Sequence, residues 1–226
     1  LLGWYIAEGF CSKDKINEYN KIVICEPKKG KYRNEIIDLI KRIGLNNNCN
    51  QNEIIFYSKQ LCKLLQLDGG IGAPNKKISK RMLNLPKDKL KILFKALVKG
   101  DGSKEQGDKK QYYFYGTTSK ELAHNFIELS LKCGYTAHYT KCKPIKTYSK
   151  KLKRTIKGNY DYYRINIRYK EFEGHIWSKK AIKRTNYKGK VWCVSVQDNK
   201  NLLVGREGKF IFCGNTTSEL VTNHKS

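Results

Sequence analysis

The chain has 226 residues, and its 46 Lys and Arg against 20 Asp and Glu give a formal net charge of +26. So large a positive charge indicates a polyanionic partner, and nucleic acid is the first candidate. An anionic membrane is the alternative, but no run of about 18 apolar residues and no signal-peptide-like start appears, so we expect a soluble, intracellular protein with no membrane partner.

The eight cysteines and four histidines are dispersed, without a C-x-x-C pair or matched Cys/His spacing. This distribution does not favour a zinc site or a disulfide framework and is typical of reduced core thiols. The chain also begins at Leu1 inside a helical pattern, so we interpret the sequence as a piece of a longer precursor.

The first predicted element is a helix at residues 1–9 (LLGWYIAEG), which has a partner at residues 94–102 (FKALVKGDG). In each copy two small residues lie four positions apart, so they share one helical face. Two such faces can pack almost backbone to backbone, which predicts a helix–helix interface. The four small residues are Gly3, Ala7, Ala96 and Gly100.

Each copy ends in an acid followed by glycine, at Glu8 and at Asp101. The glycine predicts a helix that ends in a left-handed residue. A carboxylate at a helix C-terminus faces the negative end of the dipole, which costs roughly 0.3–1 kcal/mol, and pairing the helices adds repulsion between the acids. Mg²⁺ takes one or two carboxylates and bridges phosphate oxygens, so it would offset both costs. Two buried helices with glycine caps are the alternative. Both copies, however, place an acid at the unfavourable C-terminal end of a helix, and such a repeated exception favours a functional site.

Further along the chain, residues 21–25 predict a strand and residues 34–43 a helix closed by Gly44. An offset of 90 finds the same plan again, with a strand at residues 112–115 and a helix closed by Gly134. The pattern is an internal repeat of supersecondary units.

A strand at residues 53–57 completes the first repeat, and its counterpart at residues 162–169 follows at an offset of 111 if Lys59 matches Lys170. The additional residues fall in the lysine-dense segment 141–159. This segment predicts a long basic hairpin or loop over nucleic acid, with a solvated loop as the alternative.

The strand at residues 162–169 alternates apolar side chains with Arg164, Asn166 and Arg168. Arg and Asn suit the guanine and adenine edges of the DNA major groove, so we predict DNA contact through this face. Plain solvent exposure is the alternative. We add to the predicted DNA contacts the basic side chains Lys141, Lys143, Lys153 and Arg154. After residue 191, short β segments follow without a helix between them, which predicts a small all-β unit.

The nonapeptides at residues 1–9 and 94–102 resemble the paired LAGLIDADG motifs of homing endonucleases, and the plan around them is similar to that family up to about Arg184. The resemblance implies an α+β fold in which two pseudo-symmetric αββαββα repeats form a saddle on DNA, followed by a small all-β C-terminal segment. It implies a monomeric endonuclease that uses Mg²⁺ or another divalent cation to hydrolyse both strands of a long double-stranded recognition site.

In such a protein Glu8 and Asp101 would be the catalytic acids that hold the metal. Lys59 and Lys170 are the candidates for an auxiliary catalytic lysine near each metal, with ordinary DNA-backbone contact as the alternative. Glu8 departs from the usual Asp. The second motif is also degenerate outside its contact face, at Phe94, Lys95 and Lys99.

The residues near the C-terminus resemble the last two blocks of an intein splicing domain. By this resemblance Asn215 would cyclise and Thr216 would accept the acyl group, while Cys193 and Gly214 stand where Asp and His are usual. An Asn in an ordinary Gly-Asn turn is the alternative. Splicing would need the missing N-terminal half of the same precursor. The implied domains are repeat 1 (1–92), repeat 2 (93–184), the C-terminal part of the splicing domain (185–215) and a host-protein segment (216–226).

Two other functions stay open on the sequence alone. A catalytically decayed DNA- or RNA-binding module is motivated by the degenerate second motif. Protein splicing as the main activity of the full precursor is motivated by the C-terminal segment.

Overall fold

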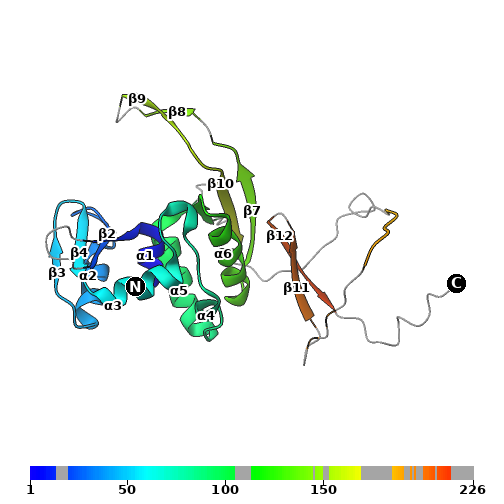
Figure 1. Cartoon of the computed structure of the whole chain (residues 1–226), viewed down its shortest axis with the longest axis horizontal. Helices are drawn as coiled ribbons and strands as arrows, with labels where there is room; N and C mark the ends of the chain where they lie inside the picture. Colours follow the sequence, from blue (N-terminus) through cyan, green and yellow to red (C-terminus); the bar gives the residue numbers. More distant parts are fainter. Residues whose placement is uncertain are drawn as a thin grey trace. The chain divides into compact units, whose positions relative to one another are not determined.

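The computed structural model describes residues 1–13, 20–104, 113–144, 146–149, 153–168, 185–190, 194, 196, 201–206 and 208–214. The chain divides into two compact units, Leu1–Glu171 and Phe172–Ser226, and each is described by itself (Figure 1). Within the described ranges, no helix has the length and apolar character needed to cross a membrane.

The first repeat of the larger unit carries three helices and an antiparallel sheet of strand order β1-β2-β4-β3. Its elements are α1 (Leu2–Glu8), β1 (Gly9–Lys13), β2 (Asn20–Cys25), α2 (Arg33–Arg42), β3 (Asn47–Cys49), β4 (Glu53–Tyr57) and α3 (Lys59–Gly69). One face of the sheet buries Ile22, Ile24, Ile54 and Phe56, and Ile36 and Ile40 of α2 are also fully buried.

The second repeat has the same strand order, β5-β6-β10-β7. Its elements are α5 (Lys87–Asp101), β5 (Gly102–Lys104), β6 (Tyr113–Thr117), α6 (Lys120–Lys132), β7 (Thr136–Cys142) and β10 (Tyr162–Arg168). Its core includes a stacked pair, Tyr115 on Phe126, with ring centroids 4.1 Å apart. The α+β class and the internal repeat are therefore confirmed.

One detail of the predicted repeat is wrong. In the first sheet Ile22 pairs with Phe56, and in the second Tyr113 pairs with Ile167. Phe56 and Ile167 correspond at the offset of 111, so Tyr113 corresponds to Ile22. The offset between β2 and β6 is therefore 91 (113 minus 22) and not 90. The first strands of the two repeats, which start at Gly9 and Gly102, are related by an offset of 93. The offset between the repeats therefore changes along the chain, because their connections differ in length. A one-residue shift exchanges the two faces of a strand, and the correct register puts the buried Tyr115 where Ile24 lies in the first repeat.

Two smaller pairs of strands complete the described chain. β8 (Lys146–Ser149) and β9 (Arg154–Lys157) form a hairpin between β7 and β10, which confirms a hairpin in the lysine-dense segment. β11 (Asn201–Arg206) pairs with β12 (Lys209–Gly214) in the second unit. Of the described cysteines, Cys62 and Cys133 are buried but Cys49 is exposed, so the prediction of core thiols is correct only in part.

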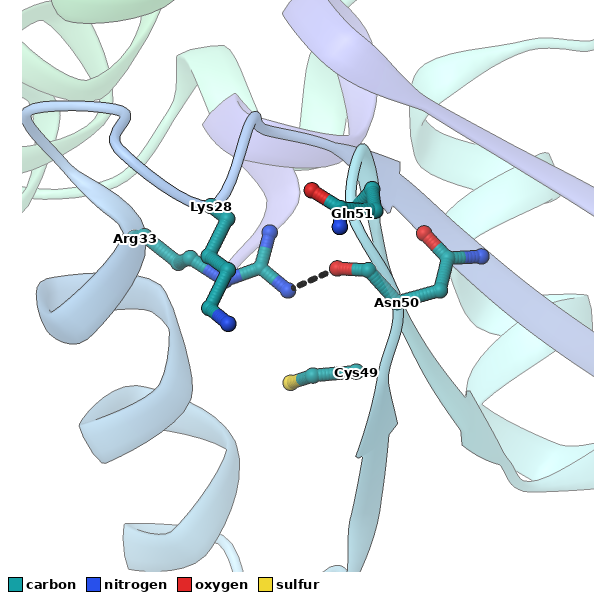
Figure 2. Close-up of a pocket in the computed structure, with 5 residues that line it drawn as sticks. All are labelled: Lys28, Arg33, Cys49, Asn50 and Gln51. Carbon is teal, nitrogen blue, oxygen red and sulfur yellow. Dashed lines mark hydrogen bonds between the residues drawn. The ribbon is translucent and has the colours of Figure 1, made fainter.

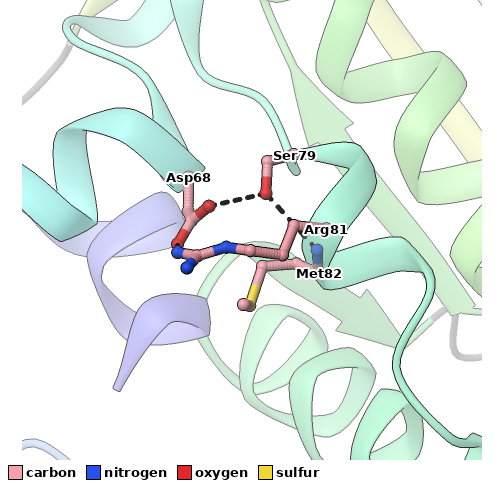
Figure 3. A network of polar contacts seen from close by, with 4 residues as sticks. All are labelled: Asp68, Ser79, Arg81 and Met82. Carbon is pink, nitrogen blue, oxygen red and sulfur yellow. Dashed lines mark hydrogen bonds and ion pairs between the residues drawn. The ribbon is translucent and has the colours of Figure 1, made fainter.

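The linker between the repeats contains η1 (Ala73–Asn75) and α4 (Lys80–Leu83). The buried carboxylate of Asp68 accepts a hydrogen bond from the Ser79 hydroxyl at 2.6 Å and forms an ion pair with Arg81 (Figure 3). The same Ser79 oxygen caps α4 by accepting a hydrogen bond from the Met82 N–H. These contacts hold the linker against the end of α3.

Candidate functional site

The helices α1 and α5 pack at nearly backbone contact. A Cβ atom added to Gly3 would lie 2.6 Å from the Ala96 Cβ, and one added to Gly100 would lie 2.5 Å from the Ala7 Cβ. Larger side chains at these positions would push the helices apart. The small residues therefore set how closely the C-terminal ends of the two helices approach.

Both helices end at the acids Glu8 and Asp101, but the glycines that follow are extended, with φ −113° at Gly9 and −84° at Gly102. The prediction of left-handed caps is wrong, because the chain passes from each helix directly into a strand. The glycines are needed for space instead. A Cβ on Gly9 would lie 2.6 Å from the Tyr5 Cα, and one on Gly102 would overlap the Val98 carbonyl.

Glu8 and Asp101 lie close enough to interact electrostatically. The Glu8 Cγ would be 3.6 Å from a Cβ on Gly100, the residue before Asp101. The Asp101 side chain is exposed in part to solvent. Desolvation by the surrounding protein, and next the Glu8 charge, raise its pKa to about 7. The Tyr115 hydroxyl, 3.5 Å away, and the Lys76 charge act in the opposite direction. Burial, and next the Glu26 charge, also raise the pKa of Glu8.

Both pKa values are raised first by removal of the carboxylates from water and second by repulsion from a neighbouring acid, so the ionised pair is disfavoured in the folded protein. Among the described residues, no group of three or more His, Cys, Asp and Glu side chains could hold a metal ion. The donor set at this site is therefore the two carboxylates of Glu8 and Asp101. Such a donor set fits Mg²⁺, which binds one or two protein carboxylates and fills its other positions with water and phosphate oxygens.

Lys76 is a residue of this site that the sequence analysis missed. Its side chain is 7% exposed, and its ammonium donates to the carbonyls of Tyr5 (2.6 Å) and Gly9 (2.7 Å). Burial lowers its pKa to about 8, against the opposing effects of Cys11 and Asp101. No periodicity or motif separates this lysine from the other basic residues of its segment, so only the fold identifies it.

Two of the three departures of the second motif, Phe94 and Lys99, have structural uses, whereas Lys95 is exposed. Phe94 is buried against Phe126 and Tyr135, with ring centroids 5.5 and 4.9 Å away. The ammonium of Lys99 lies 2.5 Å from the Glu35 carboxylate and joins α5 to α2. Packing and an ion pair therefore account for Phe94 and Lys99, and neither departure disturbs the contact between α1 and α5.

The structure places only one of the two candidate auxiliary lysines. Lys59 is the first residue of α3, separated from β4 by the N-cap residue Ser58, and its side chain is exposed. Lys170 lies outside the described residues, and so do Cys193, Asn215 and Thr216.

The predicted DNA-contacting strand, β10, alternates as expected. Ile165 and Ile167 are buried, whereas Arg164 and Arg168 are exposed and Asn166 is half-buried. The Arg164 guanidinium lies 3.8 Å from the Phe114 ring centroid. The Asn166 amide is 3.2 Å from a ring nitrogen of His138, so the outer face of this sheet combines cationic and amide groups.

The basic hairpin continues from this sheet. Figure 1 shows β8 and β9 projecting beyond β7 and β10. Lys143, Lys153 and Arg154 are exposed. Lys141 differs, because its ammonium lies 2.7 Å from the Asp161 carboxylate and is partly neutralised.

A surface pocket in the first repeat is lined by Lys28, Arg33, Cys49, Asn50 and Gln51 (Figure 2). The buried Arg33 guanidinium donates to the carbonyls of Asn50 (2.6 Å) and Glu53 (3.3 Å), and also to that of Glu26. These bonds hold the turn between β3 and β4, so we assign Arg33 a structural role.

No family model matches this chain. An uncharacterised protein of Methanocaldococcus jannaschii is 28% identical over 159 residues, which cover 63% of this chain but 17% of that protein. Variants of the homing endonuclease I-DmoI align over 74% of this chain and 80% of theirs, with 13% identity and a TM-score of 0.44. An I-DmoI variant in complex with its target DNA in the presence of magnesium aligns over 74% and 85%, with 16% identity and a TM-score of 0.43. The homing endonuclease I-WcaI bound to its DNA recognition sequence aligns over 73% and 72%, with 17% identity and a TM-score of 0.41.

Proposed function

We propose that this chain is a site-specific double-strand DNA endonuclease of the LAGLIDADG type, in which Glu8 and Asp101 hold a divalent cation such as Mg²⁺. The observation that carries the proposal is the pair of tightly packed helices that end side by side in two carboxylates whose charges repel each other. Bound there, Mg²⁺ would stabilise the developing charge at a scissile phosphate and lower the pKa of water.

The residues of the chain have separate tasks in this proposal. Glu8 and Asp101 bind the cation, and the Tyr115 hydroxyl donates to Asp101 and orients it. The cationic face of β10 and the β8–β9 hairpin hold the phosphate backbone and base edges of one half of the site. Lys59, and Lys170 in the second repeat, are proposed to contact phosphates near the acids.

Cleavage-site selection from a library of random duplexes tests the function. We expect the wild-type protein with Mg²⁺ to cut both strands at one long sequence. The double variant Glu8→Gln, Asp101→Asn should bind that duplex with similar affinity and leave it uncut, because the amides keep the shape but not the charge. Equal cutting by the double variant would show that the acids are wrongly assigned.

Binding without cleavage is the competing function. The reason to consider it is that the second motif is degenerate. The packing of Phe94 and the ion pair of Lys99 give two of these departures a structural explanation, which weakens that reason. Salt-dependent binding without Mg²⁺-dependent cleavage of any selected duplex would favour it, and a preference for RNA would identify an RNA-binding helper.

We also propose that residues 185–215 belong to an intein splicing domain. Support comes from the antiparallel pair β11–β12, which ends at Gly214, directly before Asn215. Co-expression with the upstream half of the precursor should release the joined flanking segments, and Asn215→Ala should block C-terminal cleavage. Unchanged release by Asn215→Ala would contradict the role given to Asn215.

A further inference from the structure

The β8–β9 hairpin carries two lysines directly opposite each other. In the register of its strands Lys146 pairs with Lys157, and Tyr148 pairs with Thr155. Side chains two positions apart along a strand share a face, so these four residues form one side of the hairpin, which we call the lysine face. Like charges directly opposite in an antiparallel pair destabilise it. The segment around them cannot compensate, because residues 141–160 contain seven lysines, one arginine and no acid.

The hairpin has little else to stabilise it. It is a two-stranded sheet of its own, and all four residues of the lysine face are exposed, Tyr148 to 61%. An isolated two-stranded hairpin is marginally stable in water. A row of phosphates along the lysine face would replace the repulsion between the ammonium groups by attraction to a shared partner, and the Tyr148 ring offers apolar surface beside them. The face therefore has the chemistry of a contact with a polyanion.

The hairpin lies where the first repeat has only a tight turn. β7 and β10 pair as far as Cys142 and Tyr162, and the hairpin projects beyond that point (Figure 1), whereas the first repeat closes between Cys49 and Glu53. The seven residues from Cys142 to Ser149 (149 minus 142) span at most about 23 Å when fully extended. That length corresponds to about seven base pairs of a DNA duplex. Only the second repeat has such a reach.

We propose that the lysine face is a DNA-contact surface that lengthens the recognised duplex on the side of the second repeat only, by up to about seven base pairs. Duplex DNA is the partner because the hairpin continues from β10, whose Arg164 and Arg168 are exposed, so a duplex that lies on this sheet can continue along the hairpin. The inference rests on the proposed DNA binding, and it does not depend on cleavage.

Footprinting tests the unequal half-sites. The probe is a duplex selected from a random pool by binding to the full chain in EDTA, because this selection needs no cleavage. Hydroxyl-radical protection by the wild type should extend several base pairs further on one flank. The double variant Lys146→Ser, Lys157→Ser should lose this additional protection and keep the remainder. Equal flanks in the wild type, or a long flank that persists in the double variant, would overturn the proposal.

A matched control removes the same charge elsewhere. Lys41 and Arg42 are exposed in the last turn of α2, so Lys41→Ser with Arg42→Ser also takes away two positive charges. This control should keep the long flank. Loss of the long flank in the control as well would assign the effect to net charge and would contradict a specific contact of the lysine face.

Charge reversal separates the stability of the hairpin from its binding. In Lys157→Glu an attractive pair with Lys146 replaces the repulsive one, so amide hydrogen exchange in β8 and β9 should slow. The same variant should bind the full-length probe about tenfold more weakly, because phosphate contacts are lost. Its affinity for a probe trimmed of the long flank should stay within about twofold of the wild type. Slower exchange with unchanged affinity for the full-length probe would sink the proposal.

The outcomes separate this inference from the proposed nuclease. A wild type that cuts DNA but protects both flanks equally overturns only the longer half-site. A wild type that cuts no duplex, with a long flank that depends on Lys146 and Lys157, supports the contact and removes the nuclease. Tighter binding of single-stranded DNA or RNA of the same sequence than of the duplex would contradict the chosen partner.

Discussion

The two repeats share one strand order but join their last two strands differently. In the first repeat β3 and β4 are joined by a tight turn, which Arg33 holds through the carbonyls of Asn50 and Glu53. At the offset of 90 that relates Gly44 to Gly134, the second repeat has Ala123 in place of Arg33. There β7 and β10 are joined through the β8–β9 hairpin. The arginine is present where the turn must close and absent where the chain extends outward.

The outer faces of the two sheets differ as well. At the offset of 111, Glu53, Ile55 and Tyr57 of β4 match Arg164, Asn166 and Arg168 of β10. An acid, an aliphatic and an aromatic residue thus stand where the second repeat carries two arginines and an amide. The frame that places the acids is thus the same in both repeats, whereas the surfaces proposed to meet DNA differ. The second repeat should therefore supply most of the electrostatic attraction.

The largest expected effect is at the acids, where the two repeats are most alike. Glu8→Gln and Asp101→Asn, made singly, should each lower the cleavage rate by about 10²- to 10³-fold, because each removes one of two charges that hold the cation. Single-turnover cleavage with saturating protein measures this. If one single variant cuts at the wild-type rate, the repeats do not contribute equally to the site.

The hairpin should have the next largest effect. Replacing Lys143, Lys153 and Arg154 by Ser should weaken DNA binding by about tenfold or more and reduce the salt dependence, by about 0.9 in slope per lost phosphate contact. Lys28→Ser is the control, because Lys28 lies between β2 and α2 and its N–H donates to the Gln51 carbonyl in the tight turn of the first repeat. Fluorescence anisotropy between low and high salt reports both quantities. An equal effect of Lys28→Ser would show that the second repeat has no larger share.

A smaller effect is expected at the matched pair Arg164 and Glu53. Arg164→Ala should relax base preference at one position of one half-site by about 1–3 kcal/mol, because a bidentate contact to a base edge is lost. Glu53→Ala should change base preference little. Site selection with each variant compares them, and a uniform loss of affinity at all bases would assign Arg164 to phosphate contact instead.

The smallest effect concerns stability and pH. The folded protein holds the pKa of Asp101 at about 7, above its ordinary value of 3.8, so the folded state binds the proton more tightly than the unfolded state. Its contribution therefore destabilises the fold progressively as pH rises from about 4 to 7. In EDTA at pH 7.5, Asp101→Asn should be more stable than the wild type by on the order of 1 kcal/mol after allowance for solvent screening, or about 2–4 °C. Thermal melts from pH 4.5 to 7.5 should show the difference growing, and a constant difference would contradict the raised pKa.

Much of the frame follows from the sequence alone. The small residues four apart, the acids after them and the alternation along β10 depend on helical and strand periodicity, which is local. The repeat is visible because each copy must bury the same faces. These patterns predicted the two helices, the repeated order of elements along the chain and the candidate acids.

Other features were decided only by the tertiary structure. Lys76 reaches carbonyls 71 and 67 positions away, at Tyr5 and Gly9, and no local pattern encodes such a contact. The extended glycines follow from strands that start directly at the helix ends, and the ion pair of Lys141 with Asp161 follows from the register of β7 on β10. Periodicity determines which face of an element is buried, but long-range packing decides which charge meets which carbonyl or carboxylate.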